Sequence, residues 1–384
     1  MKPLEGITVL EFCQFMAGPS AGLKLADLGA RVIKIERPGS GEAGRQIAIK
    51  NIFIEGDSLV FHTVNRNKES FAANLKDPED LAIVKKLIAQ ADVMTHNFRP
   101  GVMEKIGLDY ATVQEINPKL VYGVVTGYGA EGPWAKKPGQ DLLVQSLSGL
   151  SYLSGNKDSN PTPVGLAVSD IMTGVHLGQG ILAALVRRGK TGKGGLVEVS
   201  LLESTLDLQF EGLTTYLNDD CKAPVRAKKG SAQPYLAAPY GVYPTADGHI
   251  AIAMMPVTKL ADHLQVILPD AYQLEESWFE KRDEIMNFFR SIFTEQPTSI
   301  WLEMLEAKDI WCADVLNYQQ LTQHKGYQEL GMEQEVVTTA GEKIKTTRFP
   351  LRLDGQQYFS KKAAPRVGEH TDRIKEEFGL KINA

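Results

Sequence analysis

The sequence predicts an α/β fold, with a large domain built on a parallel sheet that helices cover on both faces and a smaller α+β domain. Three observations lead to this prediction. Strand and helix patterns alternate through the first half of the chain, the pattern changes after about residue 217, and 384 residues are enough for two domains.

Short apolar runs alternate with helical periodicity in the first half of the chain. Strands are predicted at 7–12, 31–36, 92–95, 121–126 and 197–200. Helices are predicted at 20–28, 80–90 and 171–188, with Gly29 ending the first of them. This alternation indicates a parallel sheet, because parallel strands need long crossover connections.

A different pattern follows in the second half. Residues 218–238 are rich in Lys, Pro and Ala and predict an irregular linker. The elements predicted after it are a hairpin at 240–255 turning at Asp247-Gly248, helical segments over 257–307, and a hairpin at 335–352 turning at Ala340-Gly341.

These patterns suggest the domain boundaries. We expect the large domain to comprise residues 1–215 and to be completed by the C-terminal segment 321–384. The smaller domain, with its linkers, is expected over 216–320.

Composition argues against several classes of protein. The net charge of -5 argues against a nucleic-acid binder, because phosphate contacts need a basic face. Glu5 and Glu11 interrupt any apolar signal-peptide core at the N-terminus. The most apolar stretch, 164–186, contains Asp170 and other polar side chains, so we expect no membrane span.

The cysteines give no sign of a disulfide framework or a metal site. Cys13, Cys221 and Cys312 are far apart and odd in number. Reduced thiols are typical of a cytoplasmic protein, and we expect each cysteine to be a small hydrophobic residue rather than a nucleophile.

Two glycine-containing turns suggest nucleotide binding, but neither matches a known fingerprint. Gly18 and Gly22, with Glu36 ending the next strand, are placed as in a dinucleotide-binding unit. The pattern G-x-G-x-x-G is absent, however, and Pro19 removes one amide that would face a pyrophosphate. The segment 189–195 runs from helix to strand, the reverse of a phosphate loop, so we interpret both turns as structural.

Residues 97–101 (Asn-Phe-Arg-Pro-Gly) follow a predicted strand. They could simply form a turn set by Pro-Gly. They also offer an amide, an aromatic ring and a guanidinium at the edge of the sheet where ligands of open α/β folds bind. The residue types alone leave both interpretations open.

Asp170 directly precedes the long predicted helix. An aspartate in this place is commonly an N-cap with a purely structural role. The helix N-terminus would also stabilise the charged carboxylate, so we expect Asp170 to stay ionised and able to act as a nucleophile. Asp141 and Asp158 are the other candidate acids, and amides at the start of the helix are candidates to stabilise an intermediate.

Many short motifs in one order resemble the class III CoA transferases of the CaiB/BaiF type, which include formyl-CoA:oxalate and carnitine CoA transferases. The resemblance covers most of the chain. The matching segments are Pro3–Ile7, Ala17–Pro19, Leu28–Ala30, Val32–Gly39, Asn65–Lys68, Asn97–Gly101, Ile116–Pro118, Thr126–Gly129, Ser148–Leu150, Asp170–Gly174, Lys190–Gly194 and Gly368–Thr371.

The resemblance implies a Rossmann-like large domain, an interlocked homodimer, and transfer of CoA from an acyl-CoA to a free carboxylic acid through an aspartyl-CoA thioester. Asp170 matches the aspartate nucleophile. CoA is a substrate in this reaction, and neither a further cofactor nor a metal is implied. The positions that match CoA contacts are Met16, Ala17, Arg37, Ala73, Asn74, Leu75, Lys76, Asn97, Phe98, Arg99 and Lys105.

Two departures from the family pattern leave alternatives open. Residues 233–238 contain no glycine run where formyl-CoA transferases carry a glycine-rich loop, so oxalate and formyl-CoA are in doubt as the natural pair. Gln140 stands where those enzymes have Tyr and where α-methylacyl-CoA racemases have His. A racemase and a non-catalytic CoA-binding protein are the alternative functions.

Overall fold

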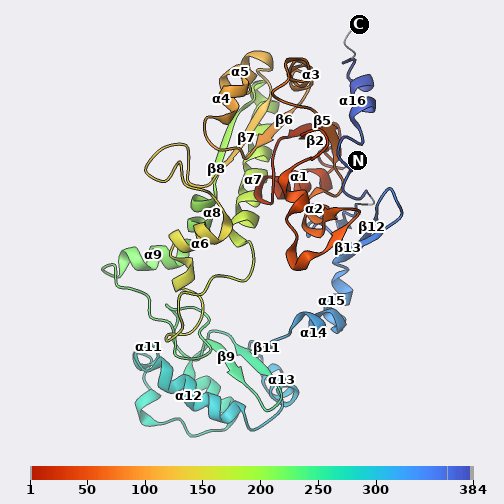
Figure 1. Ribbon diagram of the computed structural model, residues 1–384. Helices are drawn as coiled ribbons and strands as arrows, with labels where there is room; N and C mark the ends of the chain where they lie inside the picture. The colour runs from red at the N-terminus through yellow and green to blue at the C-terminus, as the bar shows by residue number, and fades with distance from the viewer. Residues whose placement is uncertain (1, 361, 381–384) are drawn as a thin grey trace. The chain divides into compact units, whose positions relative to one another are not determined.

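Both ends of the chain contribute to the same unit of the computed structural model, which describes residues 2–360 and 362–380. Unit 1 contains the residues up to Val144, Ala167–Leu208, and the residues from Leu330 onward (Figure 1). Unit 2 contains Gln145–Leu166 and Gln209–Glu329. The outer limits of the expected large domain, at 1 and 384, lie outside the described residues.

A six-stranded parallel sheet in the order β5-β2-β1-β6-β7-β8 forms the centre of unit 1. The strands are β1 (Thr8–Glu11), β2 (Arg31–Glu36), β5 (Glu69–Ala72), β6 (Val93–His96), β7 (Val121–Thr126) and β8 (Gly195–Ser200). The chain moves outward to β5 and then returns to the other side of β1. This reversal places a topological switch point between β1 and β6, where open α/β sheets bind ligands.

Helices cover both faces of this sheet, which confirms the predicted α/β class. Alternate strand residues point to opposite faces: Leu10 packs in the core that contains α3 and α5, and Val9 packs in the core that contains α1 and α7. The helices with residues in unit 1 are α1 (Ala17–Asp27), α2 (Leu59–Asn65), α3 (Pro78–Ile88), α4 (Val102–Ile106), α5 (Tyr110–Ile116), α6 (Asp141–Leu147), α7 (Val168–Thr191), α8 (Leu201–Leu208) and α16 (Thr371–Glu377).

Unit 2 is a smaller α+β structure with its own core. Its antiparallel sheet has the order β11-β10-β9, and the Thr245 amide donates to the Gly248 carbonyl across the predicted turn (3.0 Å). Its main elements are α9 (Phe210–Asn218), β9 (Gly241–Pro244), β10 (His249–Ile252), α10 (Val257–Leu264), α11 (Ser277–Glu280), α12 (Arg282–Phe293), α13 (Thr298–Glu306), β11 (Cys312–Asp314), α14 (Tyr318–Gln323) and α15 (Lys325–Leu330).

The remaining strands of the described residues form three small hairpins. They are β3 (Phe53–Ile54) with β4 (Asp57–Ser58), β12 (Glu333–Val337) with β13 (Lys343–Thr347), and β14 (Arg352–Leu353) with β15 (Gln356–Gln357). The β12–β13 hairpin turns at Gly341, which has a φ of 95°, as its sequence predicted.

Two helix starts differ from the prediction. α1 begins at Ala17 rather than at 20, because Pro19 in the first turn needs no intrahelical N–H partner. α7 begins at Val168 rather than at 171, so Asp170 lies inside the helix and is not its N-cap. No helix in the described residues is both long and apolar enough to cross a lipid bilayer.

Candidate active site

The carboxyl edge of the sheet brings together most of the expected CoA-binding residues. Met16 and Ala17 follow β1, and Arg37 follows β2. Residues 73–76 follow β5, and residues 97–99 follow β6. These four strands are adjacent in the sheet, so segments from distant parts of the sequence meet at one edge. Lys105 lies farther along the chain, near the end of the short helix α4.

Four basic side chains, three on the loops of this edge and Lys105 on α4, are available for an anionic ligand. Arg37, Lys76, Arg99 and Lys105 are exposed, and within the described part of the chain none has an ion-pair partner. Unpaired cations on neighbouring loops are suited to the phosphate groups of a nucleotide such as CoA.

Asn97 has a different position from these exposed cations. Its side-chain nitrogen donates to the Gln14 carbonyl (2.7 Å), and its oxygen accepts from the Gln14 amide (2.8 Å). The Asn97 side chain therefore ties the loop after β6 to the turn after β1, across the switch point. Ala73 is buried, and its amide donates to the Glu36 carbonyl (2.8 Å). Gln14 could not be predicted as part of this contact, because it bonds Asn97 through its backbone and its residue type carries no signal.

Asp141 caps the helix that carries Asp170. One carboxylate oxygen of Asp141 accepts from the amides of Ser169 (2.8 Å) and Asp170 (3.2 Å). The Ile171 amide donates to the Ala167 carbonyl (3.0 Å). The amides expected to stabilise a tetrahedral intermediate at this helix start already have acceptors, so that expectation is wrong.

The electrostatic environment of Asp170 differs from the one predicted. Burial and, second to it, the charge of Asp141 raise the pKa of Asp170 from its ordinary 3.8 to about 7. Burial and the like charge of Asp141 therefore favour the neutral carboxyl, against the expectation that the helix N-terminus would keep Asp170 ionised. Asp158 belongs to unit 2 and is exposed.

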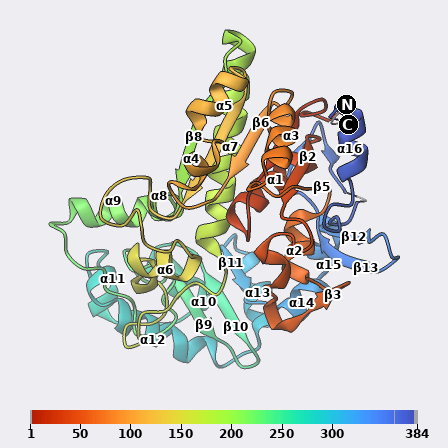
Figure 2. The same ribbon diagram turned by 45° about the horizontal axis from the view of Figure 1, so that its top comes forward.

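Close packing of α7 against α1 sets the position of Asp170. Gly174 leaves no room for a side chain: a Cβ there would lie 1.9 Å from the Ser20 Oγ and 2.8 Å from the Ala17 carbonyl oxygen. Figures 1 and 2 both show the two helices side by side. Asp170 lies one turn before Gly174 on the same face of α7. It is therefore directed toward the start of α1, where Met16 and Ala17 lie.

Gln140 directly precedes α6, and its carbonyl accepts from the Val144 amide (3.0 Å). It is exposed and adjacent in sequence to Asp141, the residue that caps α7.

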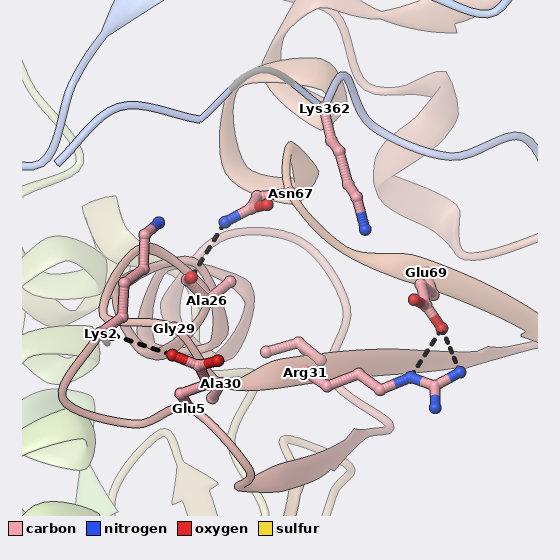
Figure 3. A pocket seen from close by; sticks show the side chains of 10 residues that line it. Lys2, Glu5, Ala26, Gly29, Ala30, Arg31, Asn67, Glu69 and Lys362 are labelled. Atoms are coloured by element: carbon pink, nitrogen blue, oxygen red, sulfur yellow. Dashed lines mark hydrogen bonds and ion pairs between the residues drawn. The ribbon is translucent and has the colours of Figure 1, made fainter.

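A pocket of about 360 Å³ lies at the opposite edge of the sheet (Figure 3). It is lined by residues at the amino ends of β2 and β5, among them Arg31 and Glu69, which form an ion pair (2.9 Å). Because Asp170 and the loops that carry Arg37, Lys76 and Arg99 belong to the carboxyl edge, this pocket is not part of the candidate active site.

Known proteins are similar to this chain over almost its full length. The model of CoA-transferase family III matches residues 4–371. The succinyl-CoA:glutarate CoA-transferase of Mus musculus is 32% identical over 383 residues, covering 98% of this chain and 86% of that protein. The acetyl-CoA:oxalate CoA-transferase of Acetobacter aceti is 31% identical, with coverages of 98% and 96%. A crystal structure of a CAIB/BAIF family protein from Brucella suis has a TM-score of 0.84 at 29% identity, covering 98% of this chain and 99% of that one.

The resemblance inferred from the motifs is thereby confirmed over almost the full length of the chain. The chain belongs to CoA-transferase family III, and it is a class III CoA transferase that moves CoA between acyl-CoA thioesters and carboxylic acids.

Proposed function

We propose that Asp170 carries the transfer as a covalent nucleophile. Its carboxylate attacks the thioester carbonyl of the donor, the C–S bond breaks, and CoA leaves as a thiolate from a mixed anhydride. The thiolate then attacks the aspartyl carbonyl, which releases the donor acid as a carboxylate and leaves an aspartyl-CoA thioester. The acceptor carboxylate attacks this thioester, and the same steps in reverse form the new acyl-CoA and free Asp170.

The position of Asp170 is the observation that carries this proposal. It lies at the carboxyl edge of the sheet, on the face of α7 that is directed toward the start of α1. With a pKa of about 7, its carboxyl is ionised and nucleophilic in a large fraction of molecules at neutral pH. Asp170 is itself the leaving group only in the last step, when CoA thiolate attacks the new acyl carbonyl of the second anhydride and frees the Asp170 carboxylate.

The bound CoA is proposed to lie along the edge formed by β5, β2, β1 and β6. Arg37, Lys76, Arg99 and Lys105 supply positive charge for its phosphates. Phe98, half-buried beside His96 with ring centroids 6.2 Å apart, supplies an aromatic surface. Met16 and Ala17 place the start of α1 next to the reacting end.

Small dicarboxylic acids are the substrates that the relatives support best. Glutarate, succinyl-CoA and oxalate occur in the names of the relatives reported above. We propose that this enzyme also exchanges CoA between dicarboxylic acids of this size. Incubation of succinyl-CoA and acetyl-CoA with a panel of C2–C6 mono- and dicarboxylates, read by the mass of the new thioester, tests this. Faster transfer to monocarboxylates than to dicarboxylates would contradict it.

Trapping of the acyl-enzyme tests the nucleophile. In wild-type enzyme with donor alone, hydroxylamine should convert Asp170 to a hydroxamate that peptide mass spectrometry detects. Asp170→Asn should fold and bind CoA but lose activity, whereas the matched Asp158→Asn, at an exposed acid of unit 2, should retain it. An adduct on Asp141 or Asp158, or activity in Asp170→Asn, would show that the assignment is wrong.

Gln140 argues against racemisation as the main reaction. A racemase needs one group to remove the α-proton and a second to return one from the opposite face. Gln140 cannot ionise, so we expect no deuterium uptake at the α-carbon of a 2-methylacyl-CoA in heavy water. Rapid exchange that depends on Asp170 would support the racemase instead.

An interlocked homodimer in the cytoplasm is the proposed assembly and location. Exposed apolar side chains, including Val186 on α7 and Phe210 and Leu217 on α9, support burial against a second copy. The three free cysteines support a reducing compartment. Sedimentation at decreasing concentration should show no folded 42.2 kDa monomer, and its appearance would contradict the interlocked dimer.

A further inference from the structure

The turn between β1 and α1 is held at every residue from Phe12 to Met16. The Phe12 amide donates to the Thr95 carbonyl (2.8 Å), and the Cys13 carbonyl accepts from the Lys34 Nζ (2.7 Å). The Gln14 amide and carbonyl both bond the Asn97 side chain, and the Met16 carbonyl accepts from the Ser20 amide (2.8 Å). The anchors of this turn therefore come from β2, from β6, from the loop after β6 and, for Met16, from α1 itself.

Phe15 is the strained member of this turn. Its φ is 65°, in the left-handed region that costs a non-glycine residue about 1–2 kcal/mol. Its side chain is 50% exposed, so packing of the ring does not explain the conformation. The Phe15 amide donates to the Glu42 carboxylate (2.8 Å), which is the bond that holds the strained residue.

Glu42 is buried, and among the described residues every hydrogen-bond and ion-pair partner of its carboxylate is a donor. The oxygen that bonds Phe15 also accepts from the Gly44 amide (3.2 Å). The other oxygen lies 3.1 Å from the Lys34 Nζ and 3.4 Å from the Asn65 Nδ2. Two donors therefore face each carboxylate oxygen. In a glutamine at position 42 the NH2 group would replace one of these oxygens and would face two donors in either orientation of the amide.

Stability alone does not account for this arrangement. Buried ion pairs are often no more stabilising than apolar residues of similar volume, and their best-supported advantage is that they specify one conformation. The Lys34–Glu42 pair meets the turn at two points, because Lys34 bonds the Cys13 carbonyl and Glu42 bonds the Phe15 amide. The conformation that this pair specifies is that of the turn.

We infer that Glu42 is a positioning residue that keeps the β1–α1 turn in its CoA-binding conformation. The inference rests on the proposed CoA site, of which Met16 and Ala17 are part. A site that is competent in only a fraction of molecules binds with an affinity reduced by that fraction. The Phe15–Glu42 hydrogen bond offsets about 1–2 kcal/mol of backbone strain at Phe15, so its loss should weaken CoA binding by about 5- to 30-fold.

Calorimetric titration of the full-length enzyme with free CoA tests this inference. Glu42→Gln should raise the Kd for CoA by about 5- to 30-fold, with the KM for acyl-CoA rising in parallel and kcat changing less. The matched control is Asp27→Asn, which breaks another buried ion pair, with Arg66 (2.6 Å), at the other end of α1. Asp27→Asn should lower the melting temperature and leave the Kd for CoA unchanged. Equal CoA affinity in Glu42→Gln and wild type would overturn the inference, as would equal weakening in both variants.

Two further measurements apply if Glu42→Gln does not fold. In wild-type enzyme, hydrogen exchange should show the Phe15 amide protected, although its side chain is exposed; rapid exchange would overturn the inference. The variant Phe15→Gly removes the free-energy cost of the left-handed backbone conformation at residue 15. Adding Glu42→Asp to this variant should therefore weaken CoA binding less than adding Glu42→Asp to wild type. Equal effects in the two backgrounds would also overturn it.

Wild-type controls separate this inference from the proposed function. If wild-type enzyme does not bind CoA, or Arg37→Ala binds it unchanged, the proposed CoA site is wrong. If wild type binds CoA, Arg37→Ala weakens it and Glu42→Gln does not, only the role of Glu42 is wrong.

Discussion

Replacement of Asp170 by Asn is expected to stabilise the folded enzyme at neutral pH while it abolishes activity. The folded-state pKa of Asp170 is about 7, above its ordinary value of 3.8. The folded state therefore holds this proton more tightly than the unfolded state does. Between these two pH values the stability of the wild-type enzyme falls as pH rises, because the carboxyl must ionise in a half-buried, poorly solvated site beside another acid.

The size of the effect follows from the same two pKa values. They differ by about 3 pH units, and each unit corresponds to about 1.4 kcal/mol. Asp170→Asn should thus gain up to about 4 kcal/mol over wild type above pH 7, and almost nothing near pH 4. The gain is an upper limit, because a half-buried asparagine amide also loses solvent.

Urea unfolding of both proteins at pH 4.5, 6 and 8 measures this difference. The stability of Asp170→Asn minus that of wild type should increase steadily with pH. Asp158→Asn, at an exposed acid, should show no such trend. A difference that is constant with pH, or that is largest in acid, would refute the buried-carboxyl explanation.

Three other substitutions have defined outcomes. Asp141→Asn keeps an oxygen that can cap α7 but removes the charge, so the acidic limb of the pH profile of kcat/KM should move to lower pH. The shift should be less than half of the difference between 3.8 and about 7, because burial is the larger cause of the raised pKa of Asp170. An acidic limb that does not move would contradict this. Arg37→Ala should weaken the binding of free CoA, measured by calorimetry, by about 1.5–3 kcal/mol, as expected for the loss of a charge-assisted hydrogen bond. Gly174→Ala forces a methyl group into α1 and should lower stability by about 1–3 kcal/mol in thermal unfolding, and an unchanged melting temperature would argue against the close helix contact.

Most of the central sheet could be predicted because its strands are apolar runs. β2 and β7 have the predicted bounds, 31–36 and 121–126. β5 was not predicted, because its first two residues, Glu69 and Ser70, are polar but buried. Their partners lie far away in sequence: Glu69 pairs with Arg31, and Ser70 donates to Glu36. Local patterns do not contain such pairings.

The candidate site was predictable to a similar extent. Each expected CoA segment except Lys105 directly follows a strand or begins the next helix, and topology alone brings such segments together. The raised pKa of Asp170 was not predictable, because its causes are burial and a contact with Asp141, 29 residues earlier in the chain. The position of Asp170 inside α7 likewise depends on this long-range cap.

The C-terminal segment of unit 1 protects the outer edge of β5. The Ser70 carbonyl accepts from the His370 amide (3.0 Å), the Ala72 amide donates to the Thr371 Oγ1 (3.0 Å), and the Asn67 amide donates to the Lys362 carbonyl (3.0 Å). During synthesis β5 leaves the ribosome roughly 300 residues before these partners. The nascent sheet therefore has an uncovered edge, open to pairing with other chains, until residues 362–371 have been made. Truncation before residue 362 should for this reason promote aggregation, even though every residue of the proposed active site is still present.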